Sequence, residues 1–430
     1  MLLGIAVLIP IFFWYKESGE MFSNGIYGIS LAIGRLTGLL ATFCALLQLV
    51  LIGRVKWVES LFGFDRLSRL HHWNGILTFF FLILHPFFVT TAYGGFGGVS
   101  FLTQTNDFIF RWSEMMQTYI ALILFIGLII LSLTIVKKKL KYEWWYFTHL
   151  GMYLAIVLAF GHQIDKGGDF QNSALFAGYW YVLYLFVFGN LLYYRFFIPI
   201  FHFWKFRFFV DHIVRENDSC TSLYIGGSRL DEFRIAPGQF FIFRFLSPKF
   251  FLEAHPYSLS IAPNGSMLRI TVKNLGDFSG RISEVPLHTS VFIDGPHGIF
   301  TPEVCRKEKI LFLAGGIGIT PIRSLIEYFV GKKDMVLLWG NNKKENIVFD
   351  NEFESFPKNG LRIFHVLSND STWNGECGFV DKEKILRLVP DVREREVYLC
   401  GPLPMMRNTL KILREIGVSN EYIHYERFSL

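Results

Sequence analysis

Four histidines lie within apolar stretches that are long enough to enter a membrane. His71 and His85 stand fourteen residues apart at the ends of HHWNGILTFFFLILHP, and His149 and His162 stand thirteen apart in HLGMYLAIVLAFGH. A histidine in hydrocarbon is costly and is usually kept because it pairs, binds a ligand or lines a pathway. On helices these spacings correspond to roughly 21 Å and 19.5 Å. Two such helices would present imidazoles at two matched depths.

Two matched pairs of imidazoles could each hold a flat cofactor, and haem with an imidazole on each face is the natural candidate. One ion bound by all four histidines is the alternative, but a separation of ~20 Å is too long for it. His149 and His162 differ by about 140° around an ideal helix, so this helix must be bent, carry a bulge or present its ligands from different sides. His72 stands thirteen residues before His85. The inner ligand there is open between His71 and His72, and we favour His71.

The composition is that of a membrane protein. Hydrophobic residues make up 52% of the 430 residues and aromatic residues 17%, whereas charged residues make up only 18%. About a quarter is usual for the charged residues of soluble proteins. The net charge of +6 does not predict nucleic-acid binding, because the basic residues flank apolar segments. The five cysteines are scattered without a CxxC, so neither a disulfide framework nor a zinc or iron-sulfur site is expected.

Six apolar runs predict a bundle of six transmembrane helices. They cover residues 2–15, 26–52, 73–91, 116–136, 145–162 and 175–200. Lysine and arginine gather after the second, fourth and sixth runs, and positive residues mark the cytoplasmic side of a membrane. We therefore expect a multi-pass protein of the cell membrane with both termini in the cytoplasm. His71 and His149 would lie near the inner face, and His85 and His162 near the outer face.

Arg35 is a charged residue inside the second apolar run, about a third of the way from its outer end. One interpretation is that its side chain extends to the membrane interface. The other is that its guanidinium pairs with the propionates of an outer haem.

The second half of the chain has a different pattern. From about Phe208, short alternating runs separated by Gly, Pro, Asn and Asp predict a small antiparallel β-barrel. From Lys309, buried strands alternate with helical stretches, which predicts a parallel α/β unit. We expect three domains, at residues 1–204, 205–303 and 304–430.

A glycine-rich turn joins a strand to a helix in ILFLAGGIGITPIRSLIEYF. Gly315, Gly316 and Gly318 let the backbone approach a phosphate. Thr320 as helix cap and Pro321 in the first turn would leave amides pointing at it. A merely structural turn is the alternative for this motif alone. Five other short polar motifs in the second half of the chain accompany this turn. They are HPYSLS at 255–260, KNLGDFSGR at 273–281, DGPHG at 294–298, CGPLPMM at 400–406 and the final ERFSL.

The order of these motifs resembles the ferredoxin-NADP reductase family. The whole chain resembles a bacterial member of the NADPH oxidase and ferric reductase superfamily, whose two haem-binding segments match RLHHWNGILTFFFLILHP and YEWWYFTHLGMYLAIVLAFGH. The resemblance implies an FAD-binding domain, an NADPH-binding domain and two b-type haems. Its haem ligands would be His71, His85, His149 and His162.

The resemblance also implies roles for residues of the soluble half. Ser258 and Tyr257 would lie against the flavin ring, and Cys400 near the nicotinamide. Phe428 resembles a terminal aromatic residue that stacks on the flavin until nicotinamide displaces it. The remaining flavin site would comprise His255, in a place where soluble relatives often have arginine, and Pro256, Lys273, Gly276, Asp277 and Ser279. The dinucleotide site would comprise Gly315, Gly316, Gly318, Thr320 and Gly401.

NADPH rather than NADH is the expected donor, although NADH stays open. Relatives often have an arginine after the strand that here reads LLWGNN, where it holds the 2′-phosphate, and this chain has Asn342 there. Lys343 and Lys344 could supply the charge, or they could simply be solvated.

These features predict transmembrane electron transfer from cytosolic NADPH through FAD and two haems. The catalytic residues implied are Ser258, Cys400 and Phe428. Dioxygen, giving superoxide, is the expected acceptor. A ferric chelate, or a partner protein fed by an electron-transfer subunit, is the alternative. No EF-hand or SH3 ligand is visible in the sequence, so activity without an obligatory regulatory partner is expected, as is contact with membrane lipid.

Overall fold

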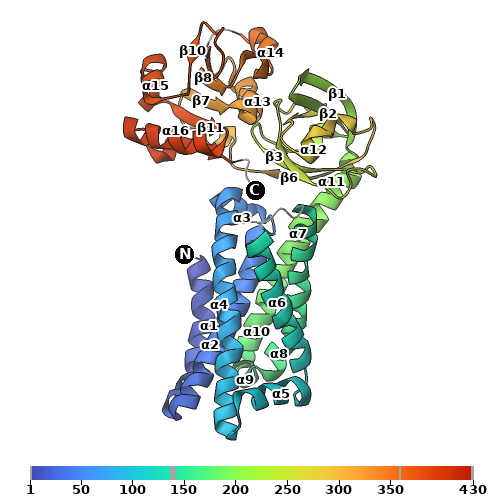
Figure 1. The fold of residues 1–430 in the computed structure, drawn as a ribbon, viewed down its shortest axis with the longest axis vertical. Helices are drawn as coiled ribbons and strands as arrows, with labels where there is room; N and C mark the ends of the chain where they lie inside the picture. Colours follow the sequence, from blue (N-terminus) through green and yellow to red (C-terminus); the bar gives the residue numbers. More distant parts are fainter. Residues whose placement is uncertain (1, 136–141, 358–359, 428–430) are drawn as a thin grey trace. The chain divides into compact units, whose positions relative to one another are not determined.

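The computed structural model describes residues 2–135, 142–357 and 360–427, and Figure 1 shows its helices and strands. The chain divides into two compact units. The first comprises Met1–Val55 and Arg66–Arg195, and the second comprises Lys56–Asp65 and Phe196–Leu430. Residues 56–65, which lie between two membrane segments in the sequence, thus belong by their contacts to the second unit.

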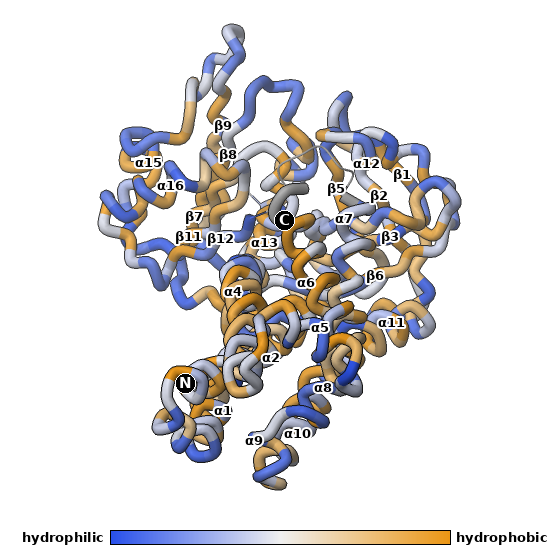
Figure 2. Tube along the Cα trace, turned by 60° about the horizontal axis from the view of Figure 1, so that its bottom comes forward, coloured by the Kyte–Doolittle hydropathy of each residue, from blue (hydrophilic) through white to orange (hydrophobic). Residues whose placement is uncertain are grey.

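The first unit is helical. Its long helices are α2 (Gly25–Ile52), α4 (Phe64–Gly97), α6 (Met115–Ile135), α8 (Gly151–Lys166) and α10 (Ala174–Leu191). Its other helices are α1 (Leu2–Ser18), α5 (Phe101–Arg111), α7 (Tyr142–His149) and α9 (Gly168–Asn172). Figure 2 shows long hydrophobic stretches along α4 and α6. Large apolar side chains such as Leu185 and Ile123 are 74% and 68% exposed, as expected where lipid rather than protein covers a helix.

Five helical segments of the described residues are long and apolar enough to cross a membrane. They are Gly25–Ile52, Phe64–Gly97, Met115–Ser132, Glu143–Lys166 and Ala174–Phe206. The prediction of six spans is therefore not confirmed. Helix α1 has 17 residues, which corresponds to about 25 Å, whereas the hydrocarbon core of a bilayer is about 30 Å thick.

The helix that carries His149 and His162 is interrupted. Helix α7 ends at His149, a turn occupies Leu150, and α8 begins at Gly151. The two histidines thus lie on two helices rather than on one continuous helix. An interruption of this kind agrees with the prediction that a regular helix could not carry both ligands on one side.

The antiparallel part of the second unit consists of two three-stranded sheets. One has the order β1 (Phe209–Asn217), β2 (Cys220–Gly226), β5 (Leu268–Lys273), and the other the order β4 (His255–Ser258), β3 (Phe240–Phe245), β6 (Val291–His297). Among the described residues, the edges of the two sheets are connected by the isolated bridges Phe209–Ser290 and Leu259–Ile270 rather than by a continuous ladder. A closed barrel is therefore not confirmed. The inward faces share one core rich in phenylalanine, including Phe241, Phe243 and Phe245.

The parallel part is a six-stranded sheet with the order β10-β9-β8-β7-β11-β12. Its strands are β7 (Lys309–Gly315), β8 (Asp334–Asn341), β9 (Leu361–Leu367), β10 (Glu376–Cys377), β11 (Glu396–Cys400) and β12 (Ile423–Glu426). All neighbouring strands pair in parallel, which confirms the α/β prediction. The order places β7, with its glycine turn, between β8 and β11.

Helices cover both faces of this sheet (Figure 1). Side chains of a strand point alternately to its two faces. Ile310 and Phe312 of β7 accordingly pack with α13 (Ile319–Phe329) and α14 (Asp350–Ser355). Leu311 and Leu313 pack with α15 (Lys382–Leu388) and α16 (Leu403–Ile416). A strand buried on both faces explains the unbroken apolar run ILFLA.

The short helices α3 (Lys56–Phe62), α11 (Ile198–Phe206) and α12 (Asp277–Gly280) also belong to the second unit.

Candidate functional site

The four membrane histidines form two facing pairs in the first unit. The ring centroids of His71 and His149 are 6.2 Å apart, and those of His85 and His162 are also 6.2 Å apart. Two imidazoles on opposite faces of one metal ion, with bonds of about 2 Å each, would place their centroids roughly 6 Å apart. His72 is exposed, so it is His71 that lies opposite His149.

Hydrogen bonds orient one histidine of each pair. His85 Nδ1 lies 2.8 Å from the Gly34 carbonyl oxygen, to which it donates. His149 Nδ1 lies 3.0 Å from Ser132 Oγ, which already donates its own proton to Leu128. Both imidazoles therefore carry their proton on Nδ1 and keep the Nε2 lone pair for a metal, the arrangement typical of metal-bound histidine.

The other two histidines each have one buried ring nitrogen to consider. Within the described residues, neither His71 Nδ1 nor His162 Nδ1 has a partner. A mostly apolar cavity lined by residues of α4, α5, α6 and α8 reaches His85 and His162. Gly38 packs against the His85 ring so closely that a Cβ there would collide with it. Paired imidazoles, unsatisfied nitrogens and an apolar cavity fit haem better than a hydrated ion.

Arg35 makes an ion pair within the first unit. Its Nη1 lies 3.1 Å from Asp169 Oδ1, and Ser18 donates to the same oxygen at 3.1 Å. The Asp169 side chain is only 5% exposed, so the carboxylate is compensated chiefly by these two groups. Arg35 directly follows Gly34, whose carbonyl oxygen orients His85. Sequence reasoning missed Asp169, which is separated from Arg35 by most of the helical unit.

The glycine turn in the second unit lies at the carboxyl end of β7. Gly316 has φ +52° and open space where a Cβ would be, whereas a Cβ on Gly318 would collide with the Cys400 carbonyl. The Trp339 indole donates to the Gly316 carbonyl at 3.1 Å. The turn is thus packed on its β11 side and open at Gly316, which suits the backbone approach to a phosphate.

Thr320 is not the helix cap that the sequence predicted. Helix α13 begins at Ile319, its N-cap is Gly318, and the Thr320 hydroxyl donates to the Ile317 carbonyl at 3.1 Å. The helix begins earlier than expected because the turn is a single 3-10 turn, Gly316–Gly318. The amide of Ile319, the first residue of α13, donates to the Gly316 carbonyl within this turn.

Cys400 and Glu426 are neighbours at the same edge of the sheet. They are paired residues of β11 and β12, and Cys400 also pairs with Ala314 of β7. Burial raises the pKa of the Cys400 thiol, and the carboxyl groups of Glu426 and Asp65 raise it further. Cys400 therefore stays a neutral thiol at physiological pH rather than a reactive thiolate. Glu426 was not singled out from the sequence, although its place in the closing ERFSL was the available signal.

The residues expected to contact flavin lie on β4 and on the loop after β5. Ser258 is buried, and its hydroxyl has no hydrogen-bond partner among the described residues. Burial also raises the pKa of Tyr257. His255 stacks on Phe278 with 4.0 Å between ring centroids. Pro256 lies between them on β4. An unsatisfied buried hydroxyl beside an aromatic side chain fits a planar ligand with hydrogen-bonding edges.

The loop after β5 is held by its own side chains. Ser279 accepts hydrogen bonds from the amides of Leu275 and Gly276 at 2.9 and 3.0 Å. Lys273 ends β5, and Asp277 opens α12. Ser279 therefore shapes this loop, whereas Lys273, Gly276 and Asp277 stay accessible to a ligand.

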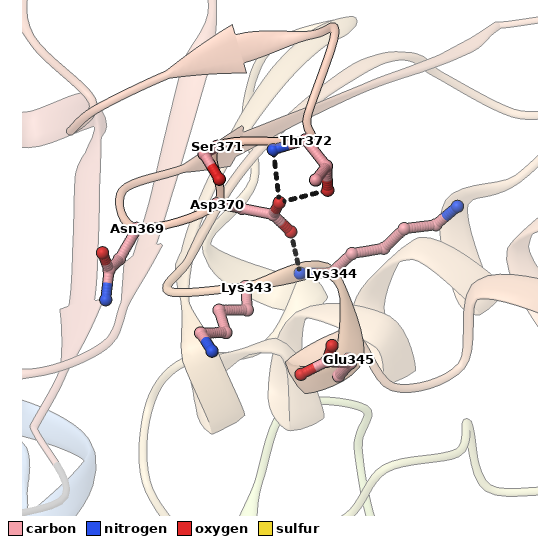
Figure 3. A pocket seen from close by; sticks show the side chains of 7 residues that line it. All are labelled: Lys343, Lys344, Glu345, Asn369, Asp370, Ser371 and Thr372. Carbon is pink, nitrogen blue, oxygen red and sulfur yellow. Dashed lines mark hydrogen bonds between the residues drawn. The ribbon is translucent and has the colours of Figure 1, made fainter.

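A polar pocket follows the carboxyl ends of β8 and β9. Figure 3 shows Lys343 and Lys344 on one side and Asn369, Asp370, Ser371 and Thr372 on the other. Asp370 accepts hydrogen bonds from the Lys344 amide at 3.1 Å and from the Thr372 hydroxyl at 2.7 Å. The two lysine side chains extend in different directions (Figure 3).

Two further residues were expected at the dinucleotide and flavin sites. Gly401 follows Cys400 and packs against Gly315. Phe428 lies outside the described residues.

Three family models match successive parts of the chain. Residues 37–160 match a ferric reductase like transmembrane component, residues 214–301 an FAD-binding domain, and residues 312–411 an oxidoreductase NAD-binding domain. In this order, the three matches resemble the domain organisation of the NADPH oxidase and ferric reductase superfamily, to which the sequence analysis pointed. The transmembrane match agrees with the apolar helices of the first unit, and the C-terminal region combines matches to an FAD-binding and an oxidoreductase NAD-binding domain, as ferredoxin-NADP reductase-like regions do.

Curated oxidoreductases are similar to part of this chain. A flavohemoprotein of Bacillus anthracis is 29% identical over 256 residues, which cover 52% of this chain and 61% of the relative. An NADH-cytochrome b5 reductase 1 of Aspergillus terreus is 32% identical over 33% of this chain and 52% of the relative. The chain thus spans about half to three fifths of these relatives' length.

Among solved structures, the FAD/NAD-binding domain of nitric oxide dioxygenase from Vibrio cholerae O1 biovar El Tor is similar. It is 25% identical, with a TM-score of 0.47, and the match covers 51% of this chain and 98% of that one.

Proposed function

We propose that this protein carries electrons from cytosolic NADPH through FAD and two b-type haems across the cell membrane to dioxygen, producing superoxide. The two facing histidine pairs support this proposal most strongly, because each has the spacing of two imidazoles on one iron. The chain also carries its own FAD- and NAD-binding domains. A complete path from nicotinamide to the far side of a membrane can thus reside on one polypeptide.

FAD accepts two electrons as a hydride and releases them singly, and haem carries one electron at a time. The residues of this chain supply binding and orientation. The open backbone at Gly316 would receive the dinucleotide phosphates, with Cys400 beside the nicotinamide. Ser258 would donate a hydrogen bond to the flavin edge. The four histidines would hold the two irons, His85 and His149 being oriented through their Nδ1 protons.

A metal reductase is the second candidate function. The transmembrane match is to a ferric reductase like component, and both functions use the same electron path. If each histidine pair held one haem iron, its two imidazoles would leave no open position there, so either acceptor would be reduced at the outer side without binding that iron. We expect no obligatory regulatory partner, and both termini and the dehydrogenase region in the cytoplasm.

The test is aerobic NADPH oxidation by the purified protein loaded with FAD and haem, with a reporter that superoxide reduces. A signal abolished by superoxide dismutase supports the proposal. A signal that survives, with fast anaerobic reduction of a ferric chelate, supports the metal reductase. Haems that NADPH reduces but that react slowly with both acceptors would indicate a missing partner protein and overturn both.

A further inference from the structure

Three consecutive residues just after β4, 260–262, are bonded to one face of α13 in the second unit. The hydrogen bonds run from Arg323 to the Ser260 carbonyl at 2.9 Å, from Ser324 to the Ile261 carbonyl at 2.9 Å, and from the Ala262 amide to Glu327 at 2.7 Å. Residues three and four apart lie on the same side of a helix, so one face of α13 makes these bonds. Strand β4 carries Ser258, and α13 follows the glycine turn. One strip of backbone thus joins the candidate flavin and dinucleotide sites.

Two buried guanidinium groups meet at the Ser260 carbonyl. Arg269 of β5, which is 2% exposed, donates to this carbonyl through Nη2 at 2.9 Å. Arg323, which is 5% exposed, donates to the same oxygen from α13. Buried cations lose their hydration and repel one another, so two guanidinium groups at one carbonyl require a negative charge beside them.

Glu352 of α14 supplies this negative charge to both arginines. Arg269 donates to its two oxygens at 2.7 and 3.2 Å, and Arg323 Nε donates to Oε2 at 2.7 Å. Burial by itself would raise the pKa of Glu352, but the hydrogen bonds and charges of the two arginines lower it. Glu352 is therefore ionised at physiological pH. Glu327 also lies 2.7 Å from Arg323 Nη1, so two carboxylates balance the two guanidinium groups.

We propose that Glu352 is a positioning residue for hydride transfer, which holds Arg269 and Arg323 on the Ser260 carbonyl and so fixes α13 relative to β4. The inference rests on the proposed function, in which a hydride with both its electrons passes from NADPH, which becomes NADP+, to the flavin. Glu352 is not among the residues expected to contact either ligand, so it acts through the distance between them. A displacement of about 1 Å between reacting groups can slow a reaction about a hundredfold.

The test is anaerobic stopped-flow reduction of the flavin by NADPH in the protein loaded with FAD and haem. Glu352→Gln keeps the shape of the side chain and removes its charge. It should lower the limiting rate at saturating NADPH about tenfold to a hundredfold. The NADPH concentration that gives half the limiting rate should change by no more than about twofold, because the glycine turn is unaltered. The matched control is Glu354→Gln on the same helix, since Glu354 is exposed.

A wild-type limiting rate in Glu352→Gln, with FAD retained, would overturn the proposal, as would equal slowing in Glu354→Gln. Deuterium at the transferred position of NADPH should slow Glu352→Gln further, because the hydride step limits its rate. A slowed variant without this isotope effect would also overturn the proposal.

If Glu352→Gln loses FAD, Ser324→Ala carries the same test. It removes one hydrogen bond between α13 and residues 260–262 and leaves the charges balanced, so the limiting rate should fall about twofold to fivefold. An unchanged rate in this variant would then overturn the proposal. Failure of the proposed function is seen separately, as wild-type protein whose flavin NADPH does not reduce.

Discussion

Ser258 illustrates how a single residue carries a prediction. Its hydroxyl is buried and has no hydrogen-bond partner among the described residues, and leaving such a group unsatisfied costs about 1–3 kcal/mol. A ligand that accepts this hydrogen bond would remove the cost. The arrangement is therefore consistent with a hydroxyl kept for the flavin rather than for the fold.

We expect Ser258→Ala to slow flavin reduction by NADPH about tenfold to a hundredfold, because a hydrogen bond to the reacting ring is lost. Anaerobic stopped-flow absorbance of the flavin measures this rate. Stability should change little, since the fold makes no use of the hydroxyl. Ser258→Thr, which keeps a hydroxyl, is the control. A normal rate in Ser258→Ala would exclude the assigned role.

Lys343 and Lys344 carry the prediction of NADPH preference. Both are exposed beside the pocket of Figure 3, where Asp370 holds the turn that bears them. Replacing both with alanine should lower the ratio of kcat/KM for NADPH over NADH about tenfold, since one charge-assisted contact to the 2′-phosphate is lost. Steady-state kinetics with both nucleotides measures the ratio.

The matched control replaces Lys332 and Lys411, two exposed lysines elsewhere in the same unit. Single variants should show which of Lys343 and Lys344 matters, because their side chains point in different directions (Figure 3). An unaltered nucleotide preference in the double variant would mean that these lysines are only solvated.

At the scale of elements, one buried arginine joins the amino ends of three parallel strands. Arg395, which is 1% exposed, donates to the Ile310 and Asp334 carbonyls at 3.2 and 3.1 Å. Its charge is balanced by Asp391 and Asp334, each at 2.7 Å. The network lies at the opposite end of the sheet from the glycine turn, so it bears on stability rather than on chemistry.

This network predicts a dependence of stability on pH. The hydrogen bond from Arg395, aided by Lys309, lowers the pKa of Asp391 from 3.8 to about 2. A carboxyl group whose pKa is lower in the folded state stabilises the fold above its unfolded pKa. That contribution is lost as the pH falls from about 4 towards about 2.

Asp391→Asn should lower the free energy of unfolding of the second unit at pH 7 by about 1–3 kcal/mol, because a hydrogen bond to a charged group is weakened. The difference from wild type should shrink as the pH falls below about 4. Flavin fluorescence on heating reports this unfolding. A difference that stays constant from pH 7 to pH 3 would contradict the prediction.

The interruption between α7 and α8 is the other decisive feature at this scale. The spacing of His149 and His162 predicted that the helix could not be regular, and left open whether it bends, bulges or presents its ligands from different sides. The structure places the break at Leu150, directly after His149. The thirteen-residue spacing of the two histidines reveals that their directions on a regular helix would not match. Where the helix breaks depends instead on how neighbouring helices pack, as Gly151 packs against Leu128.

At the scale of the whole molecule, the basic residues of the connections predict that the dehydrogenase region is cytoplasmic. Cys377 gives a direct test. It is exposed, whereas Cys44, Cys220 and Cys400 are buried. A thiol reagent that cannot cross membranes should label the protein in inside-out vesicles but not in intact cells.

Cys377→Ser is the control, and it should remove most of the label. Labelling of Cys377 in intact cells would place the dehydrogenase region outside and would contradict the proposed direction of electron transfer.

Sequence alone determined the features that depend on local pattern and composition. Apolar runs identified the membrane helices α2, α4, α6, α8 and α10, and alternation identified the antiparallel and parallel strands, because burial in lipid or between layers imposes its own periodicity. The histidine spacing and the glycine turn likewise pointed to two pairs of ligands and a dinucleotide site.

Only the tertiary structure decided which distant residues meet. Asp169 pairs with Arg35 across 134 residues, and Asp65 meets Arg427 across 362. It also decided that residues 56–65 pack with the dehydrogenase unit. Such contacts leave no local pattern, because a lone carboxylate has the same appearance in a sequence whether it is solvated or buried against a charge. The physical difference is desolvation, which exists only once the chain has folded.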